Sequence, residues 1–309
     1  MNLSPRPHVR PHVRPSSAGR RFVIGVPLAW LTIAFLIPFL IVLRMSFSEL
    51  DETGSPFGPL LTFSDGVLSI KAKVVNYVAL TEDSTYLWTF LRSLGYAGLT
   101  MVLCLVTGYP FAYFMARANP AYRTVLLMMV MLPFWTSFLL RIYAWKGILA
   151  NQGLLNNLLL WLGAIDEPLK MMNTPFALVL GMFYAYLPFM ILPLYANLVK
   201  LDVRYLEAAA DLGATPWQAF WRITVPLSKS GIIAGAMLVF IPAVGEFVIP
   251  ELLGGPETLM IGRLLWDEFF VNTDWPRASA LAVVAISLIL VPMAIFNKYK
   301  AEQEAEGRV

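Results

Sequence analysis

The sequence is poor in charged residues and almost lacks cysteine and histidine. Charged side chains make up 14% of its 309 residues, against about 25% in an average soluble domain. Cys104 is the single cysteine, which excludes an intrachain disulfide and a cysteine metal site. Both histidines, His8 and His12, lie near the N-terminus. The chain therefore offers no Ser–His–Asp set for hydrolysis.

Motifs for nucleotide and metal binding are missing as well. No GxxxxGK[ST] run occurs, and no group of histidines and carboxylates has the spacing of metal ligands. The net charge is only +3, and the basic residues are unevenly placed, which is a signal of membrane topology more than of nucleic-acid binding. These absences predict a chain that performs no chemistry itself, holds no metal and binds no nucleic acid.

Apolar residues, in contrast, are abundant. They form 58% of the chain, and the mean hydropathy is +0.66. A helix needs roughly 20 apolar residues to cross a hydrocarbon core of about 30 Å. Six segments satisfy this requirement, at about 22–43, 94–116, 124–146, 176–198, 230–252 and 278–297. Because the alternation of a membrane barrel is absent, we expect an all-α membrane protein with six transmembrane helices.

The first 21 residues are basic and rich in proline and serine, and the tetrapeptide PHVR occurs twice, at 7–10 and 11–14. Such a segment predicts a disordered tail, and a metal-binding tract at the two histidines is the alternative. The apolar run at 22–43 is too long for a signal-peptide core and has no cleavage site behind it. We therefore predict an uncleaved first span.

The placement of lysine and arginine predicts the orientation of the chain. With the N-terminus inside, the cytosolic parts hold 14 basic and 6 acidic residues, and the opposite side holds 9 basic and 14 acidic residues. Both termini, including the tail at 301–309, are then cytosolic in a multi-pass membrane protein. Longer loops at 44–93, 147–175 and 253–277 lie outside.

Prolines lie inside most of the predicted spans. Each removes a hydrogen bond from its helix and favours a kink. Either they are ordinary irregularities of membrane helices, or the helices bend around a pathway. The residues concerned are Pro38, Pro110, Pro133, Pro188, Pro193, Pro242 and Pro292.

A polar stretch at 200–229, here called the coupling loop, separates two very apolar spans. It contains the sequence EAAADLGATPWQAFWRITVP at 207–226. Asp202 is placed to cap a first short helix, and Gly213 is placed to end it, since a left-handed position suits glycine. The three alanines at 208–210 give this helix a shallow face that a partner's backbone can approach closely.

A second short helix is expected after Gly213. Thr215 is a good N-cap, Pro216 fits the first helical position and Gln218 completes a capping box. We expect this helix to run to about Arg222 and to be stopped by Pro226. Two such short helices are too small to hold themselves together, so the loop predicts an element that docks on another surface.

The same residues resemble the EAA…G………I.LP signature of the permease subunits of ATP-binding cassette (ABC) importers. The signature residues here are Glu207, Ala208, Ala209, Gly213, Ile223 and Pro226. Val225 stands where leucine is usual, which is a mild departure. The resemblance implies the type I importer permease fold, with this loop inserted into a groove of a cytosolic ATPase subunit.

Three further stretches resemble the polyamine importer permeases, and among these the putrescine type. They are LPFWTSFLLRIYAWKGIL at 132–149, YAYLPFMILPLY at 184–195 and the segment at 240–270. The similarity runs from about Gly25 to Lys300, so we expect a permease domain at 22–300 between the two tails. It implies a second, homologous permease, an ATPase dimer that binds ATP and Mg²⁺, and a periplasmic polyamine-binding protein.

Glu246 is the clearest candidate for contact with a cationic cargo. It lies in PAVGEFVIP, and counting from residue 230 places it roughly 24 Å up a hydrocarbon core about 30 Å thick. An ionisable group inside a span is costly and marks a functional site by default. The flanking proline and glycine predict a weakened helix. The alternative is a structural ion pair with Arg141 at a similar depth.

Other candidates for the substrate pathway are acidic or aromatic. Asp267 and Glu268 follow the LLGGPET turn and either face the outer vestibule or are solvated loop charges. Aromatic rings stack on alkylammonium groups, although near a membrane surface they are more often interfacial anchors. The aromatic candidates are Trp135, Tyr143, Tyr184, Tyr186 and Trp266, with Tyr184 and Trp135 first because each lies in a span near a proline.

Six helices with an incomplete set of polar groups make half of a pathway. The resemblance therefore predicts alternating access, in which ATP-driven closure of the ATPase dimer pulls on the coupling loops of two permeases. Three alternatives remain open. The cargo can be spermidine or another small organic solute, or the chain can be a secondary transporter with inverted repeats, or it can be a membrane enzyme.

Overall fold

The computed structural model describes residues 17–50, 58, 61–64, 67–70 and 73–305, and these are almost entirely helical. In chain order the elements are α1 Ser17–Ser46, β1 Leu61–Ser64, β2 Val67–Ile70, α2 Val75–Glu82, α3 Ser84–Arg117, α4 Pro120–Met131, η1 Leu132–Trp135, α5 Phe138–Leu149, α6 Leu154–Trp161, α7 Pro175–Leu198, α8 Arg204–Asp211, α9 Pro216–Ala219, η2 Phe220–Thr224, α10 Val225–Leu227, α11 Lys229–Val244, α12 Val248–Leu253, η3 Pro256–Thr258, α13 Ile261–Trp266, η4 Asp267–Val271 and α14 Trp275–Ala305. The all-α prediction is confirmed for the segments expected to cross the membrane.

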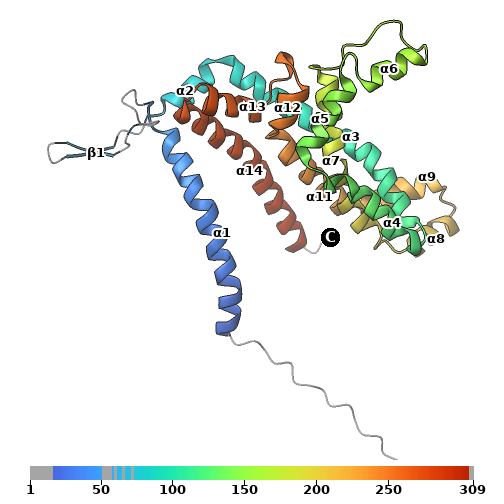
Figure 1. Ribbon diagram of the computed structural model, residues 1–309. Coiled ribbons are helices and arrows are strands. Elements are labelled where there is room, and N and C mark those ends of the chain that lie inside the picture. The colour runs from blue at the N-terminus through green and yellow to red at the C-terminus, as the bar shows by residue number, and fades with distance from the viewer. Residues whose placement is uncertain (1–16, 51–57, 59–60, 65–66, 71–72, 306–309) are drawn as a thin grey trace, which may run out of the picture.

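One small sheet was not predicted. β1 and β2 form an antiparallel hairpin in which Leu61 pairs with Ile70 and Ser64 pairs with Val67. The hairpin lies in the loop expected at 44–93, and Figure 1 shows it at one side of the molecule near α2. A two-stranded hairpin does not alter the helical class of the fold.

Among the described residues, three helices are long and apolar enough to cross a membrane, and the number rises to five if each of two bent helix pairs is one span. The apolar part of α14, Trp275–Leu290, is shorter than these helices. The count of six spans therefore stays a prediction, although the strongly apolar helices agree with it in position.

Helix boundaries differ from those expected at both ends of the chain. α1 already begins at Ser17, so the last five residues assigned to the tail are helical, while residues 1–16, with both histidines, lie outside the described part. α14 likewise extends to Ala305, into the segment expected as a C-terminal tail.

α3 starts at Ser84 and not near residue 94, because the side chain of Asp83 accepts a hydrogen bond from the amide of Thr85 at 2.8 Å. Hydrogen bonds from the side chain and then the backbone of Thr85 lower the pKa of Asp83. A charged cap of this kind extends the helix beyond the apolar span.

The core is built from α3, α7 and α11. Large side chains such as Met115, Met182 and Leu194 are completely buried or nearly so between these helices. Glycine permits the close approach of α7 and α11, since a Cβ added at Gly235 would lie 2.7 Å from the Sδ of Met190. Small residues at helix contacts are the usual way for membrane helices to pack closely.

α1 stands apart from this core. Figure 1 shows it beside α14 and away from α3, α7 and α11. None of its most apolar 18-residue window is buried, and Phe22, Trp30 and Phe35 are each at least 70% exposed. A helix with an apolar surface all round is normally covered by lipid or by other protein.

The described residues contain two sharply bent helix pairs, one within the span predicted at 124–146 and one just before the span predicted at 230–252. The section from α4 to η1 meets the section from α5 to α6 at 86°, and the section from Pro216 to Leu227 meets α11 at 66°. Pro133 lies at the first bend, whereas α7 stays helical through Pro188 and Pro193. Proline thus accompanies some bends here but does not by itself determine them.

Candidate functional site

The coupling loop begins with α8 and a left-handed turn, as the sequence predicts. The carboxylate of Asp202 accepts a hydrogen bond from the amide of Arg204 at 3.0 Å. At the other end of α8, Gly213 has a φ of +82°, and the amide of Ala214 reaches back to the carbonyl of Ala209 at 2.9 Å. The expected cap and the expected glycine stop are both confirmed.

The second helix of the loop also begins as predicted. The hydroxyl of Thr215 accepts the amide of Gln218 at 3.3 Å, and the side chain of Gln218 accepts the amide of Thr215 at 3.1 Å. These two bonds form a complete capping box, with Pro216 at the first helical position.

The end of this helix was predicted wrongly. It does not stop near Arg222 but continues through the π-helical turn η2 and through α10, which ends at Leu227 with Pro226 inside it. In η2 the amide of Val225 bonds to the carbonyl of Phe220, five residues back. The wider π turn relieves the clash that proline makes with the carbonyl four residues before it.

The signature residues occupy both sides of this loop. Glu207, Ala208, Gly213 and Pro226 are exposed, while Ala209 is buried and Ile223 is half-buried. Large apolar side chains are exposed beside them, namely Tyr205, Leu212, Trp217, Trp221 and Leu227, with Leu212 89% and Trp217 70% exposed. Figure 1 places α8 and α9 at the end of the molecule away from α2, α12 and α13.

A second interruption lies at Glu246, between α11 and α12. Its Oε1 accepts the amides of Val248 at 3.0 Å and Ile249 at 3.4 Å, so the side chain caps α12. Its other carboxylate oxygen accepts a hydrogen bond from the hydroxyl of Tyr186 on α7. Glu246 is only 9% exposed. The weakened helix predicted at this position is a real break, and three protein donors satisfy the carboxylate that lies in it.

α13 packs against the backbone of this break at very short range. A Cβ added at Gly262 would lie 2.4 Å from the carbonyl oxygen of Gly245 and 2.6 Å from that of Glu246. Phe247, the residue after Glu246, stacks on Trp266 with ring centroids 4.5 Å apart. Trp266 in turn contacts Phe270 at 4.1 Å.

Arg141 does not pair with Glu246. Within the described part of the chain no ion pair joins these two residues, so the alternative that the sequence left open is not formed. The guanidinium carbon of Arg141 instead lies 5.3 Å from the ring centre of Phe134 and 5.6 Å from that of Phe138.

A row of rings connects Arg141 with Glu246. Phe134 meets Phe189 edge-to-face at 5.2 Å, and Phe189 lies 6.2 Å from Tyr186, which bonds Glu246. We did not single out Phe134 or Phe189 from the sequence. Phe189 follows Tyr186 by three residues on one helix, and this spacing was the signal for a shared face.

The remaining aromatic candidates do not gather around Glu246. Trp135 is 80% exposed on η1, and Tyr143 is exposed on α5 with the ammonium of Lys146 5.9 Å from its ring centre. Tyr184 contacts Trp145 edge-to-face at 5.4 Å. Because Tyr184 and Tyr186 are two residues apart on α7, they face different sides of that helix.

Asp267 and Glu268 have different surroundings although they are neighbours. Asp267 is partly exposed, 3.9 Å from Arg263, which also pairs with Glu251 of α12 at 2.8 Å. Glu268 is only 4% exposed and accepts hydrogen bonds from Tyr86 at 2.6 Å and from Asn272 at 2.9 Å. Glu268 is therefore not a solvated loop charge.

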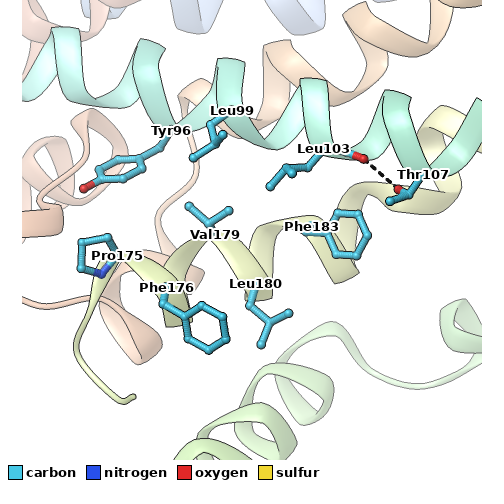
Figure 2. Close-up of a pocket in the computed structure, with 9 residues that line it drawn as sticks. All are labelled: Tyr96, Leu99, Leu103, Thr107, Pro175, Phe176, Val179, Leu180 and Phe183. Atoms are coloured by element: carbon cyan, nitrogen blue, oxygen red, sulfur yellow. Dashed lines mark hydrogen bonds between the residues drawn. The ribbon is translucent and has the colours of Figure 1, made fainter. Parts of the chain in front are cut away.

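Two hollows on the surface differ in their chemistry. A groove of about 410 Å³ between α3 and α7 has an almost purely apolar lining, which Figure 2 shows, and the hydroxyl of Thr107 there bonds to Leu103 of its own helix. This groove has no charged side chain in its lining that would pair with a cation. A polar recess of about 540 Å³ lies at the other end of α3, between Glu82, Asp83 and Arg277.

Comparisons with known proteins agree with this architecture. Residues 108–300 match the family model described as binding-protein-dependent transport system inner membrane component. This range contains the coupling loop, the break at Glu246 and most of α14.

Named relatives extend the match over nearly the whole chain. The chain is 39% identical over 290 residues to a spermidine/putrescine transport system permease protein of Haemophilus influenzae, covering 94% of this chain and 96% of that protein. It is 41% identical over 254 residues to the protein of that name in Escherichia coli K12, covering 82% and 88%. An inner membrane ABC transporter permease protein of the same strain is 32% identical, covering 89% and 88%.

A solved structure supports the fold. The chain matches a bacterial ABC transporter involved in the import of the acidic polysaccharide alginate with a TM-score of 0.64 at 18% identity, covering 90% of this chain and 96% of that one. A related structure holds an alginate-bound periplasmic protein, with a TM-score of 0.63. The chain belongs to the family of binding-protein-dependent transport system inner membrane components, the non-catalytic permease subunits of ABC importers.

Proposed function

We propose that this chain is one permease subunit of an ATP-driven importer that moves putrescine, or a related polyamine, from a periplasmic binding protein into the cytosol by alternating access. The observation that carries the proposal is the coupling loop, which has caps at both of its helices and exposes Leu212 and Trp217. A self-capped element with apolar side chains in water requires a partner surface.

The partner of the coupling loop is a cytosolic ATPase dimer that binds ATP and Mg²⁺. Glu207, Ala208 and Gly213 lie on the exposed side of the loop, where an ATPase groove can receive them. Trp217 and Leu212 supply apolar area for the contact, and aromatic side chains commonly dominate the energy of such interfaces.

A second, homologous permease completes the pathway. The uncovered apolar surface of α1 supports this part of the proposal, since Phe22, Trp30 and Phe35 contact little of their own chain. Arg141 supports it too, because its Nε is buried and lacks a hydrogen-bond partner among the described residues.

Glu246 and Tyr186 are the proposed point of contact for an ammonium group of the cargo. A carboxylate offers about four acceptor positions, and Glu246 uses three of them for Val248, Ile249 and Tyr186. A bound ammonium can therefore join the carboxylate without displacing the cap. Relatives named as spermidine/putrescine permeases favour a cationic cargo of this size.

The other pathway candidates take supporting roles. Trp135 and Tyr184 lie near the bend between η1 and α5, and Arg141 is shielded from the cargo by the rings of Phe134 and Phe138. Asp267 and Glu268 lie beyond the break, where we place the outer vestibule and the docking surface of the binding protein.

Nucleotide binding drives the transport cycle in this proposal. Closure of the ATPase dimer moves both coupling loops, and each permease turns from a cytosol-facing to a periplasm-facing state in which the binding protein releases the polyamine. Hydrolysis resets the inward state. Each step depends on contacts that differ between the two states.

The orientation in the inner membrane follows from the positive-inside rule. Both termini and the coupling loop at 200–229 are cytosolic, and the permease domain spans 22–300 between the tails at 1–21 and 301–309. The loops at 44–93, 147–175 and 253–277 face the periplasm.

Reconstitution of the complete complex tests the proposal. Proteoliposomes containing this chain, its second permease, the ATPase and the loaded binding protein should accumulate radiolabelled polyamine only when ATP is supplied. Parallel assays with putrescine and spermidine identify the preferred cargo. Uptake driven by an ion gradient without ATP would indicate a secondary transporter, and a stand-alone activity of the purified chain would indicate a membrane enzyme.

A further inference from the structure

Phe220 is one of the residues that attach the coupling loop to the helical core, together with Val225 and Ser228. Phe220, the first residue of the π turn η2, is half-buried and packs against the hydrophobic core. Its ring meets Tyr109 edge-to-face at 5.4 Å and Tyr113 edge-to-face at 5.9 Å, and both tyrosines belong to α3. Phe220 thus lies between two side chains that are one helical turn apart.

The same ring is held from the side of the loop. Trp217 stacks on Phe220 at 6.1 Å with an interplanar angle of 19°, and Trp221 meets it edge-to-face at 5.3 Å. Trp217 and Trp221 are exposed. A protein that binds these two tryptophans therefore contacts the rings that pack directly on Phe220.

Tyr109 connects this contact to α11. It is only 7% exposed, and its hydroxyl lies 2.8 Å from that of Ser228. Ser228 is the residue at which the chain bends by 66° into α11, the helix that leads to the break at Glu246. The bend is therefore held against α3 by the tyrosine that also contacts Phe220.

We propose that Phe220 is the positioning residue through which movement of the coupling loop is passed to α3 and, by way of Tyr109 and Ser228, to α11. The π turn η2 begins at this ring, and π turns are frequent at functional positions. The inference rests on the proposed function, since the movement comes from the ATPase.

The variants that test it are F220L and Y109F. Leucine keeps an apolar side chain in the core but removes all four ring pairs of Phe220, three of which are edge-to-face. Phenylalanine at 109 keeps the ring contact and loses only the hydroxyl bond to Ser228. The matched control is F111L, because Phe111 lies on α3 between the two tyrosines but is 59% exposed.

Two readouts are measured on the reconstituted full complex. The first is the number of polyamine molecules taken up per ATP hydrolysed, with co-purification of the ATPase recorded for each variant. The second is the change in distance, on nucleotide binding, between spin labels at L99C and E257C in a C104S background. This readout does not depend on the cargo.

We expect F220L to keep the ATPase and hydrolyse ATP but to transport about tenfold less per ATP, with the distance change abolished. Y109F should transport about threefold less polyamine per ATP than the wild type, and F111L should match the wild type. A wild-type distance change in F220L would overturn the inference, as would loss of the ATPase, since Phe220 would then shape the docking surface. If the wild-type complex shows the distance change without polyamine uptake, the cargo assignment fails while the role of Phe220 is still tested.

Discussion

The coupling loop and the break at Glu246 are both interruptions of long helices, but they are held in different ways. At the caps of α8 and α9 the hydrogen bonds join residues two to five positions apart, and the outer side chains are exposed. At the break Glu246 also caps the next helix, yet it depends on Tyr186, 60 residues away, and on the close approach of Gly262.

This contrast explains how the two regions can serve different purposes. The caps of the loop are local and its outer side chains are exposed, so these side chains can change partners without disturbing the core. A buried carboxylate with distant donors keeps its position only while the surrounding helices keep theirs, so it responds when they move. Substitutions at the break should therefore affect transport, and substitutions of the exposed side chains of the loop should affect partner binding.

The largest effect is expected from E246Q. Glutamine can still accept the amides of Val248 and Ile249 through its oxygen and can donate to the hydroxyl of Tyr186, so the cap survives while the charge is lost. We expect polyamine uptake to fall about 100-fold, the scale of a lost hydrogen bond to a charged group. The measurement is uptake into proteoliposomes, with co-purification of the ATPase as a check on assembly.

E251Q is the control for that variant. Glu251 lies on α12, close to Glu246 in the sequence, but it is half-exposed in an ion pair with Arg263. We expect the loss of the Glu251 charge to leave polyamine uptake nearly unchanged. Wild-type transport kinetics in E246Q would refute the role of Glu246 in the pathway.

The next largest effect is expected from W217A. Because Trp217 is 70% exposed, alanine should not change the melting temperature of the isolated chain. Affinity for the ATPase should fall about 30-fold, corresponding to the ~2 kcal/mol of an interface hot spot. W161A is the matched control, since Trp161 is 80% exposed on α6. Equal ATPase binding by W217A and W161A would show that the loop docks elsewhere.

A smaller effect is expected from T215A, which sharpens the comparison because it removes only the capping box. The loss of an N-cap costs about 1 kcal/mol, so ATPase association should weaken about fivefold while the core is unaffected. T81A is a suitable control, because the hydroxyl of Thr81 bonds the carbonyl of Val78 in its own helix. A drop in the melting temperature of T215A without loss of ATPase binding would contradict the docking role.

Sequence reasoning predicted the local features of both regions. Asp202, Gly213, Thr215 and Gln218 act as expected because caps and left-handed turns depend on residues a few positions apart. The break near Glu246 was indicated by the adjacent glycine and prolines for the same reason.

Features that depend on distant contacts were not predictable in this way. No local pattern joins Tyr186 to Glu246, Tyr86 to Glu268 or Arg141 to Phe134, since these pairs come from helices far apart in the sequence or from a bend. The continuation of the helix through Pro226 was missed because a π turn has no simple sequence signal. The hairpin at 61–70 was missed because it lies in a loop between strong apolar signals.

The location of the coupling loop is the claim on which the account depends most directly. L212C in a C104S background places one cysteine at a side chain that is 89% exposed. We predict that it reacts with a membrane-impermeant reagent only from the cytosolic side, and that in the assembled complex it cross-links to the ATPase. Labelling from the periplasmic side, or an assembled and active complex without that cross-link, would contradict the account.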